Sequence, residues 1–141
     1  MARILIVEDD PMNAKLFSLI LSRKGNHETI TAKDAEDAVR YSTSGDVDLI
    51  IMDVSLQNWV FDGNEVNGVD LTRIIRRDPR SENVSILLAT AYAMKNDREN
   101  LLHESGADDY FAKPISDQNL FVSKVDGLLK TAGVRTDKGN R

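Results

Sequence analysis

The sequence contains several short, continuous apolar runs, and one of them ends directly on a carboxylate. Residues Leu49 to Met52 are all apolar, and Asp53 follows them. An apolar run of this length predicts a strand that is buried on both faces, as in parallel sheets covered by helices. In such sheets ligands bind at the carboxyl ends of the strands. We therefore expect Asp53 to lie at the functional edge of a parallel sheet.

Segments of helical periodicity alternate with further apolar runs. The additional strands predicted are Arg3–Val7, His27–Thr31, Ile86–Thr90 and Tyr110–Ala112. The helices predicted from the spacing of apolar residues run from Pro11 to Gly25, from Asp34 to about Ser42, around Leu71 to Ile75, from about Lys95 to Ser105, and after Ser116. Five strands alternating with five helices predict an α/β fold with a doubly wound parallel sheet.

Three segments complete the expected organisation. We predict one domain at 1–131, with an enlarged loop at 54–68, and a polar C-terminal tail at 132–141 that frays from Gly133. Asp10, followed by proline, is expected to cap the first helix, and Ser116 the last.

Composition narrows the class of protein. The chain of 141 residues has 41% hydrophobic and 29% charged residues, which is typical of a globular domain. A net charge of −5 argues against a nucleic-acid partner, and no apolar stretch is long enough to cross a membrane. The chain has no cysteine, which fits a reducing compartment, and no signal peptide is evident. We expect a cytoplasmic protein.

Reactive side chains follow four of the predicted strands. Glu8 and Asp9 follow the first, Asp53 ends the third, Thr90 ends the fourth and Lys113 follows the fifth. Carboxyl ends of parallel strands share one edge, so we expect these groups to converge. Acidic oxygens hold a hard cation such as Mg²⁺, and a further carboxylate can accept a phosphoryl group. A hydroxyl and an ammonium would bind phosphoryl oxygens.

The same residues carry a resemblance to a known family. The motifs are Ile4-Leu5-Ile6-Val7-Glu8-Asp9-Asp10, Leu49-Ile50-Ile51-Met52-Asp53, Ala89-Thr90-Ala91 and Tyr110-Phe111-Ala112-Lys113-Pro114. In this order and spacing, they resemble the motifs of response-regulator receiver domains of two-component systems, the CheY-like family, over residues 2–130. The resemblance implies a five-stranded sheet in the order 2-1-3-4-5.

For the acidic residues, the resemblance implies a phosphoacceptor and a magnesium site. Asp53 would accept the phosphoryl group and also contact the cation. Asp9 would be a direct Mg²⁺ ligand and Glu8 a ligand through water. Ser55 would contribute its backbone carbonyl.

For the remaining residues, the resemblance implies phosphoryl binding and switching. Thr90 would bind the phosphoryl group, and Lys113 would pair with Asp53 or its phosphate. Tyr110 would be an aromatic switch that turns inward when Thr90 moves.

The implied function is that of a single-domain response regulator in a phosphorelay, not a conventional enzyme. A sensor histidine kinase or a histidine phosphotransfer protein would be the donor. A downstream protein would bind the surface of the fourth helix, fifth strand and fifth helix, and the chain would be a monomer or weak dimer.

Two other functions stay open. One is a binding module that works without phosphorylation through the loop at 54–68. The other is a small-molecule phosphatase, although such enzymes often place a second acid where this chain has Ser55.

The loop after Asp53 departs from the family pattern. Gln57 stands where related receivers usually have proline, and the glycine that follows is delayed to Gly68, which leaves about seven extra residues. Trp59 and Phe61 within the loop either pack it onto the domain or contact a partner. The run Asp62-Gly63-Asn64-Glu65 does not fit the spacing of a calcium loop. Both histidines, His27 and His103, are expected at the surface.

Overall fold

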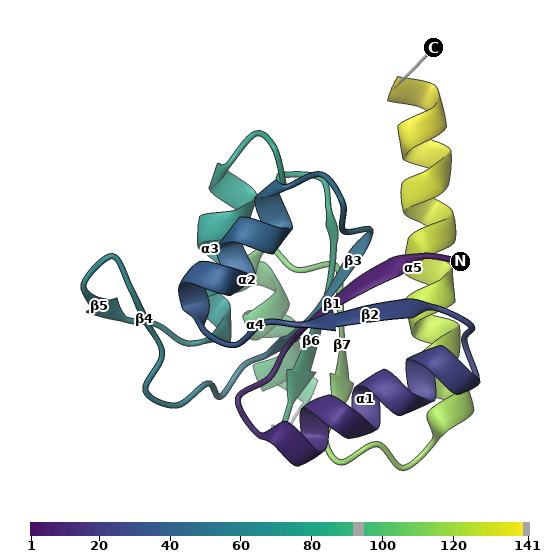
Figure 1. Ribbon diagram of the computed structural model, residues 1–141, viewed down its shortest axis with the longest axis horizontal. Coiled ribbons are helices and arrows are strands. Elements are labelled where there is room, and N and C mark those ends of the chain that lie inside the picture. Colours follow the sequence, from purple (N-terminus) through teal and green to yellow (C-terminus); the bar gives the residue numbers. More distant parts are fainter. Residues whose placement is uncertain (92–94, 140–141) are drawn as a thin grey trace.

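The computed structural model describes residues 1–91 and 95–139 of the chain. Its centre is a parallel sheet of five strands in the order β2-β1-β3-β6-β7 (Figure 1). These strands are β1 (Arg3–Val7), β2 (Glu28–Thr31), β3 (Leu49–Asp53), β6 (Ser85–Thr90) and β7 (Asp109–Ala112). Counted along the chain without the short strands of the inserted loop, this order is 2-1-3-4-5. The predicted fold class and strand order are confirmed.

Helices cover both faces of the sheet (Figure 1). One face carries α1 (Pro11–Arg23) and α5 (Gln118–Gly139). The other carries α2 (Ala35–Thr43), α3 (Gly68–Arg77) and α4 (Lys95–Ser105). Each face has its own apolar core. Among the described residues, no helix combines the length and apolar character needed to cross a membrane.

Strand β3 is apolar throughout because both of its faces are buried. Ile50 and Met52 pack into the core under α2, α3 and α4, whereas Leu49 and Ile51 pack into the core under α1 and α5. All four side chains are fully buried. Burying one such side chain contributes roughly 1.5–3 kcal/mol. Asp53 is therefore fixed at the end of a fully buried strand.

Three phenylalanines fill the core between α1, β7 and α5. The ring centroid of Phe111 lies 5.7 Å from that of Phe17 and 4.6 Å from that of Phe121, and the Phe17 and Phe121 centroids are 5.9 Å apart. Aromatic pairs at these distances contribute beyond their buried area. They hold the start of α5 against β7, next to the segment that carries Lys113.

The helix ends agree with the sequence in α1 but not in α5. Asp10 accepts a hydrogen bond from the Met12 backbone N–H at 3.0 Å, so its predicted capping role is confirmed. Ser116, by contrast, is not the cap of α5. Because this helix begins at Gln118, Asp117 is in the capping position, and its carboxylate accepts from the Leu120 N–H at 2.9 Å.

The C-terminal segment also differs from the prediction. Helix α5 runs to Gly139, so residues 132–139 of the expected tail are helical. Residues 140 and 141 lie outside the described residues. Helical hydrogen bonds link each turn to the next, and the apolar anchor at the start of α5 supports this continuation. The domain boundary expected at residue 131 stays a prediction.

His27 is not the surface residue that the sequence suggested. Its side chain is only 10% exposed. Its Nδ1 accepts from the Ala2 backbone N–H at 3.2 Å, and its Nε2 lies 2.7 Å from Asp126 Oδ1. The imidazole thus joins the N-terminus to α5. His103 is exposed, as expected.

The inserted loop contains a small hairpin that projects from the domain beside α2 (Figure 1). Strand β4 (Val60–Phe61) pairs antiparallel with β5 (Asn64–Glu65). The two turn residues, Asp62 and Gly63, have φ angles of 52° and 82°, as a two-residue hairpin turn requires. An Asp-Gly pair is a sequence signal for this turn, and it could have predicted the hairpin.

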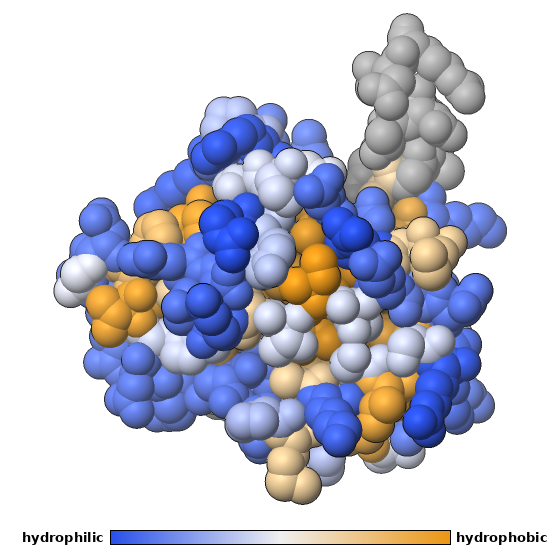
Figure 2. Space-filling model, viewed as in Figure 1, coloured by the Kyte–Doolittle hydropathy of each residue, from blue (hydrophilic) through white to orange (hydrophobic). Residues whose placement is uncertain are grey.

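The surface of this hairpin is partly apolar. Figure 2 shows an apolar patch on the projecting end, within a mostly hydrophilic face. Val60 is 54% exposed there. Trp59 and Phe61, by contrast, are partly buried against the core under α2 and α3. These two aromatic residues therefore pack the loop onto the domain, one of the two alternatives left open by the sequence.

Gly68 closes the inserted loop against the carboxyl-terminal edge of the sheet. Its backbone N–H donates to the Val54 carbonyl at 3.1 Å. A Cβ atom at this position would lie 2.0 Å from the Asp53 backbone oxygen. Only glycine allows this approach, because the obstacle is backbone that cannot rotate away.

We predict opposite effects for two glycine-to-alanine substitutions. Gly68→Ala should lower the free energy of unfolding by about 3 kcal/mol, because the methyl group overlaps the Asp53 backbone. Gly127→Ala in α5 should raise it by about 0.5–1 kcal/mol, because a Cβ there meets nothing within 4 Å and alanine favours helix. Urea denaturation measures both. Equal effects would contradict the proposed backbone contact at Gly68.

Candidate functional site

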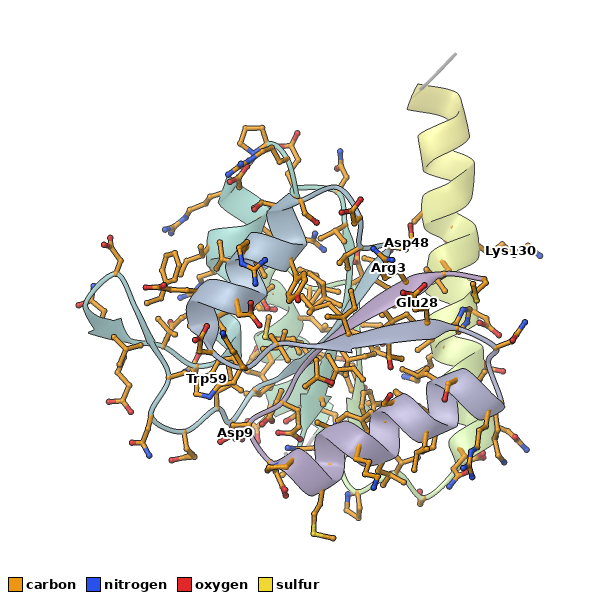
Figure 3. The ribbon with its side chains drawn as sticks, viewed as in Figure 1. Arg3, Asp9, Glu28, Asp48, Trp59 and Lys130 are labelled. Atoms are coloured by element: carbon orange, nitrogen blue, oxygen red, sulfur yellow. The ribbon has the colours of Figure 1, made fainter. Side chains whose placement is uncertain are left out.

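Three carboxylates meet at the carboxyl ends of β1 and β3. These strands are neighbours, with Val7 opposite Met52, so Glu8 and Asp9 come next to Asp53. One oxygen from each of the three acids lies within 4.8 Å of the others. Glu8 and Asp53 are buried, whereas Asp9 is half-buried; Figure 3 shows Asp9 where β1 passes into α1.

Lys113 brings a positive charge into this acidic cluster. Its Nζ donates to Asp53 Oδ1 at 2.8 Å and lies 3.4 Å from Glu8 Oε1. The lysine follows β7, and its backbone N–H donates to the Thr90 carbonyl at 2.9 Å, which fixes its segment against β6. The three carboxylates from the ends of β1 and β3 and this lysine therefore converge, as the sequence indicated.

Burial and the contacts among these groups shift their pKa values in different directions. Burial, followed by the hydrogen bond and charge of Asp53, raises the pKa of Glu8 to about 8. Burial opposes ionisation of Asp53, but hydrogen bonds with Glu8 and Lys113 outweigh it and lower the Asp53 pKa. Burial likewise opposes the charge of Lys113, but Asp53 and Glu8 raise the lysine pKa. At neutral pH without a cation, Glu8 is protonated while Asp53 and Lys113 are charged.

Thr90 ends β6 directly beside these groups. Its side chain is only 1% exposed. Ala89 pairs with Asp53, and Thr90 pairs with Ala112, the residue before Lys113. Thr90 therefore ends the strand that lies between the two strands carrying the acid and the lysine.

Ser55 and Gln57 lie on the loop that leaves Asp53. The Ser55 N–H donates to Asp53 Oδ1 at 3.1 Å. Gln57 donates its backbone N–H to Asp9 Oδ2 at 3.0 Å and its side-chain amide to the Ser55 carbonyl at 3.1 Å. Sequence reasoning identified Gln57 only as a departure from the family pattern and missed both contacts, which depend on the path of the backbone.

Tyr110 lies on β7, partly buried against the core under α3 and α4. Two cations flank its ring: Arg98 Cζ is 5.4 Å from the centroid and Lys124 Nζ is 5.0 Å from it. Lys124 also donates to the Tyr110 carbonyl at 2.8 Å. The ring is thus held between α4 and α5. Residues 92–94, which follow Thr90 and Ala91 in the sequence, lie outside the described residues.

The donor set fits a magnesium ion. Glu8, Asp9 and Asp53 offer carboxylate oxygens, the ligands that Mg²⁺ prefers. When all three are ionised, Lys113 balances only one of their charges. A divalent cation would offset the remainder and replace the proton that Glu8 otherwise holds.

We predict that Glu8 makes the cation-free protein less stable as the pH rises from about 5 to 8. In this window unfolded Glu8 has lost its proton, whereas folded Glu8 keeps it until about pH 8. The folded state then binds more protons, so the free energy of unfolding falls with pH, by at most about 1.4 kcal/mol per pH unit. Asp53, with its lowered pKa, titrates below this window.

Urea denaturation in EDTA at several pH values measures this slope. The Glu8→Gln variant keeps a neutral hydrogen-bonding side chain but cannot titrate, so its stability should fall less steeply. Identical slopes for the two proteins would contradict the proposed protonation of Glu8.

Comparisons with known proteins agree with this geometry. Residues 4–125 match the family model of the response regulator receiver domain. The chain is 33% identical over 129 residues to the polar-differentiation response regulator DivK of Brucella ovis, which covers 92% of this chain and 97% of the relative. DivK of Brucella abortus matches to the same extent.

Solved structures give the same result. A putative response regulator from Chloroflexus aurantiacus superposes with a TM-score of 0.78 at 29% identity, covering 92% of this chain and 98% of that one. The receiver domain of a sensor histidine kinase from Pseudomonas aeruginosa, described with a magnesium ion coordinated in its active-site cleft, gives 0.71 at 31% identity. That match covers 94% of this chain and 98% of the other. The chain belongs to the response regulator receiver domain family.

Proposed function

We propose that this receiver domain accepts a phosphoryl group on Asp53 from a phosphohistidine. The donor would be a sensor histidine kinase or a histidine phosphotransfer protein. The observation that carries the proposal is the buried Asp53 carboxylate with the Lys113 Nζ at 2.8 Å. A buried carboxylate with a lowered pKa is available as a nucleophile at neutral pH.

The transfer exchanges one bond to phosphorus for another. An oxygen of Asp53 forms a P–O bond as the P–N bond of the phosphohistidine breaks, and the imidazole nitrogen keeps the bonding electrons. The product is an acyl phosphate on Asp53. Attack of water on its phosphorus would later return free phosphate and the carboxylate, so the chain would catalyse only its own phosphorylation and dephosphorylation.

The neighbouring residues would stabilise charge on the phosphoryl oxygens. Bound by Glu8, Asp9, Asp53 and the Ser55 carbonyl, Mg²⁺ would supply positive charge at this point. Lys113, already paired with Asp53, would move its contact to a phosphoryl oxygen. The Thr90 hydroxyl would donate to another oxygen.

The signal would leave through the surface formed by α4, β7 and α5. Tyr110 lies at its centre, between Arg98 and Lys124, and movement of Thr90 on the next strand would change the space available to the ring. Phosphorylation would shift an existing equilibrium between two arrangements of this surface. We propose that the phosphorylated domain acts through protein contact at this surface. A monomeric or weakly dimeric state stays a prediction.

We expect Asp53→Asn to abolish labelling by a small acyl-phosphate donor in the presence of Mg²⁺. Asparagine has similar size but lacks the nucleophilic carboxylate. Mass spectrometry of the intact protein measures the gain of one phosphoryl group. Asp46→Asn, an exposed acid on another loop, is the matched control and should label like the wild type. Undiminished labelling of Asp53→Asn would refute the assignment.

The alternative of a binding module independent of phosphorylation rests on the exposed part of the 54–68 loop. Val60 on β4 offers an apolar contact there. In that case a partner should bind wild type and Asp53→Asn equally, and amide spectra should not respond to Mg²⁺ with a phosphate mimic. The ionised pair of Asp53 and Lys113 favours the phosphoacceptor function instead.

A further inference from the structure

Gln57 contacts two of the groups that the proposed function assigns to the cation. Its backbone N–H donates to Asp9 Oδ2 at 3.0 Å, and its side-chain Nε2 donates to the Ser55 carbonyl at 3.1 Å. One residue thus engages a carboxylate and a carbonyl of the same site. Proline has neither a backbone N–H nor a side-chain amide, so neither contact would exist if the usual proline stood here.

The two contacts should act on the cation in opposite directions. The backbone N–H holds the Asp9 carboxylate in place next to Glu8 and Asp53, which prepares the acid for binding. The side-chain amide, however, occupies a lone pair of the Ser55 carbonyl. Its hydrogens carry partial positive charge, so they would also repel a cation that binds the same oxygen.

The surrounding loop fixes Gln57 from both sides. On one side the Ser55 backbone N–H donates a hydrogen bond to Asp53 Oδ1. On the other, Asn58 has a φ of 61°, and Trp59, which Figure 3 shows at the foot of the hairpin, packs against the core. The Trp59 carbonyl also accepts from the Val66 N–H at 2.9 Å. The backbone contact to Asp9 is therefore part of a packed loop.

The side chain of Gln57, by contrast, is exposed and has space to move. It borders an open groove of about 500 Å³ between the start of the loop and α3, which Ser55, Glu65 and Asp70 also line. An amide released from the Ser55 carbonyl can enter this groove and be solvated without disturbing the packed part of the loop.

We propose that the Gln57 side chain competes with the divalent cation for the Ser55 carbonyl oxygen and thereby lowers the magnesium affinity of the site. The inference rests on the proposed function, because it takes this carbonyl as a ligand. Gln57 is thus a positioning residue, because its side chain sets the Mg²⁺ concentration at which Asp53 becomes competent for phosphorylation.

Mg²⁺ titrations of Gln57→Ala and Gln57→Met test this proposal. Both variants keep the backbone N–H to Asp9 and lose the side-chain donor, and methionine also keeps the length of the side chain. We expect both to bind Mg²⁺ about three- to tenfold more tightly than wild type, the range that corresponds to one net hydrogen bond. Gln118→Ala, which removes an exposed amide at the start of α5, is the matched control and should bind as wild type does.

Calorimetry gives the dissociation constant, and fluorescence of Trp59, the single tryptophan of the chain, gives an independent value. Unchanged or weaker binding in both Gln57 variants would overturn the proposal. Tighter binding in Gln57→Ala alone would also overturn it, because methionine lacks the donor as well.

Failure of this inference can be distinguished from failure of the proposed function. If wild type binds Mg²⁺ and is labelled on Asp53 but the Gln57 variants titrate identically to it, only the role of Gln57 is wrong. If neither wild type nor the variants bind Mg²⁺, and Asp53 is not labelled, both proposals are wrong.

Discussion

Repulsion between carboxylates at neighbouring strand ends is the constraint on which the rest of this structure depends. The sheet brings Glu8, Asp9 and Asp53 together, and burial of two of them makes each uncompensated charge costly. A proton on Glu8 and the ammonium of Lys113 offset this cost. Under the proposed function, a cation and a phosphoryl group would both alter this balance of charge.

The distribution of elements around the sheet follows from this requirement. Lys113 reaches Asp53 only because β7 lies next to β6 and the phenylalanine cluster holds the start of α5 beside it. Tyr110 lies on β7, which Lys113 directly follows, and it packs on the opposite face of the sheet from Phe111. Charge at the site and contacts at the α4–β7–α5 surface are thus carried by one short segment of chain.

Much of the fold and of the candidate site could be predicted because continuous apolar runs indicate buried strands and the residues after them share one edge. Features that depend on a shift of one residue, or on contacts between residues distant in sequence, could not be predicted. The cap of α5 lies at Asp117, one residue beyond Ser116, and the half-buried His27 pairs with Asp126, which is distant in sequence. The contacts of Gln57 likewise need the folded path of the loop.

The hydrogen bond between Gly68 and Val54 bears on what the length of the insertion costs the domain. Together with the tight approach to Asp53, it closes the insertion at its base, where the chain leaves the carboxyl-terminal edge of the sheet and returns to it. Lengthening a loop whose ends are already joined costs little, since closure entropy grows only slowly with length. Hairpins of different size and sequence at this point would therefore leave the strand ends below them in place.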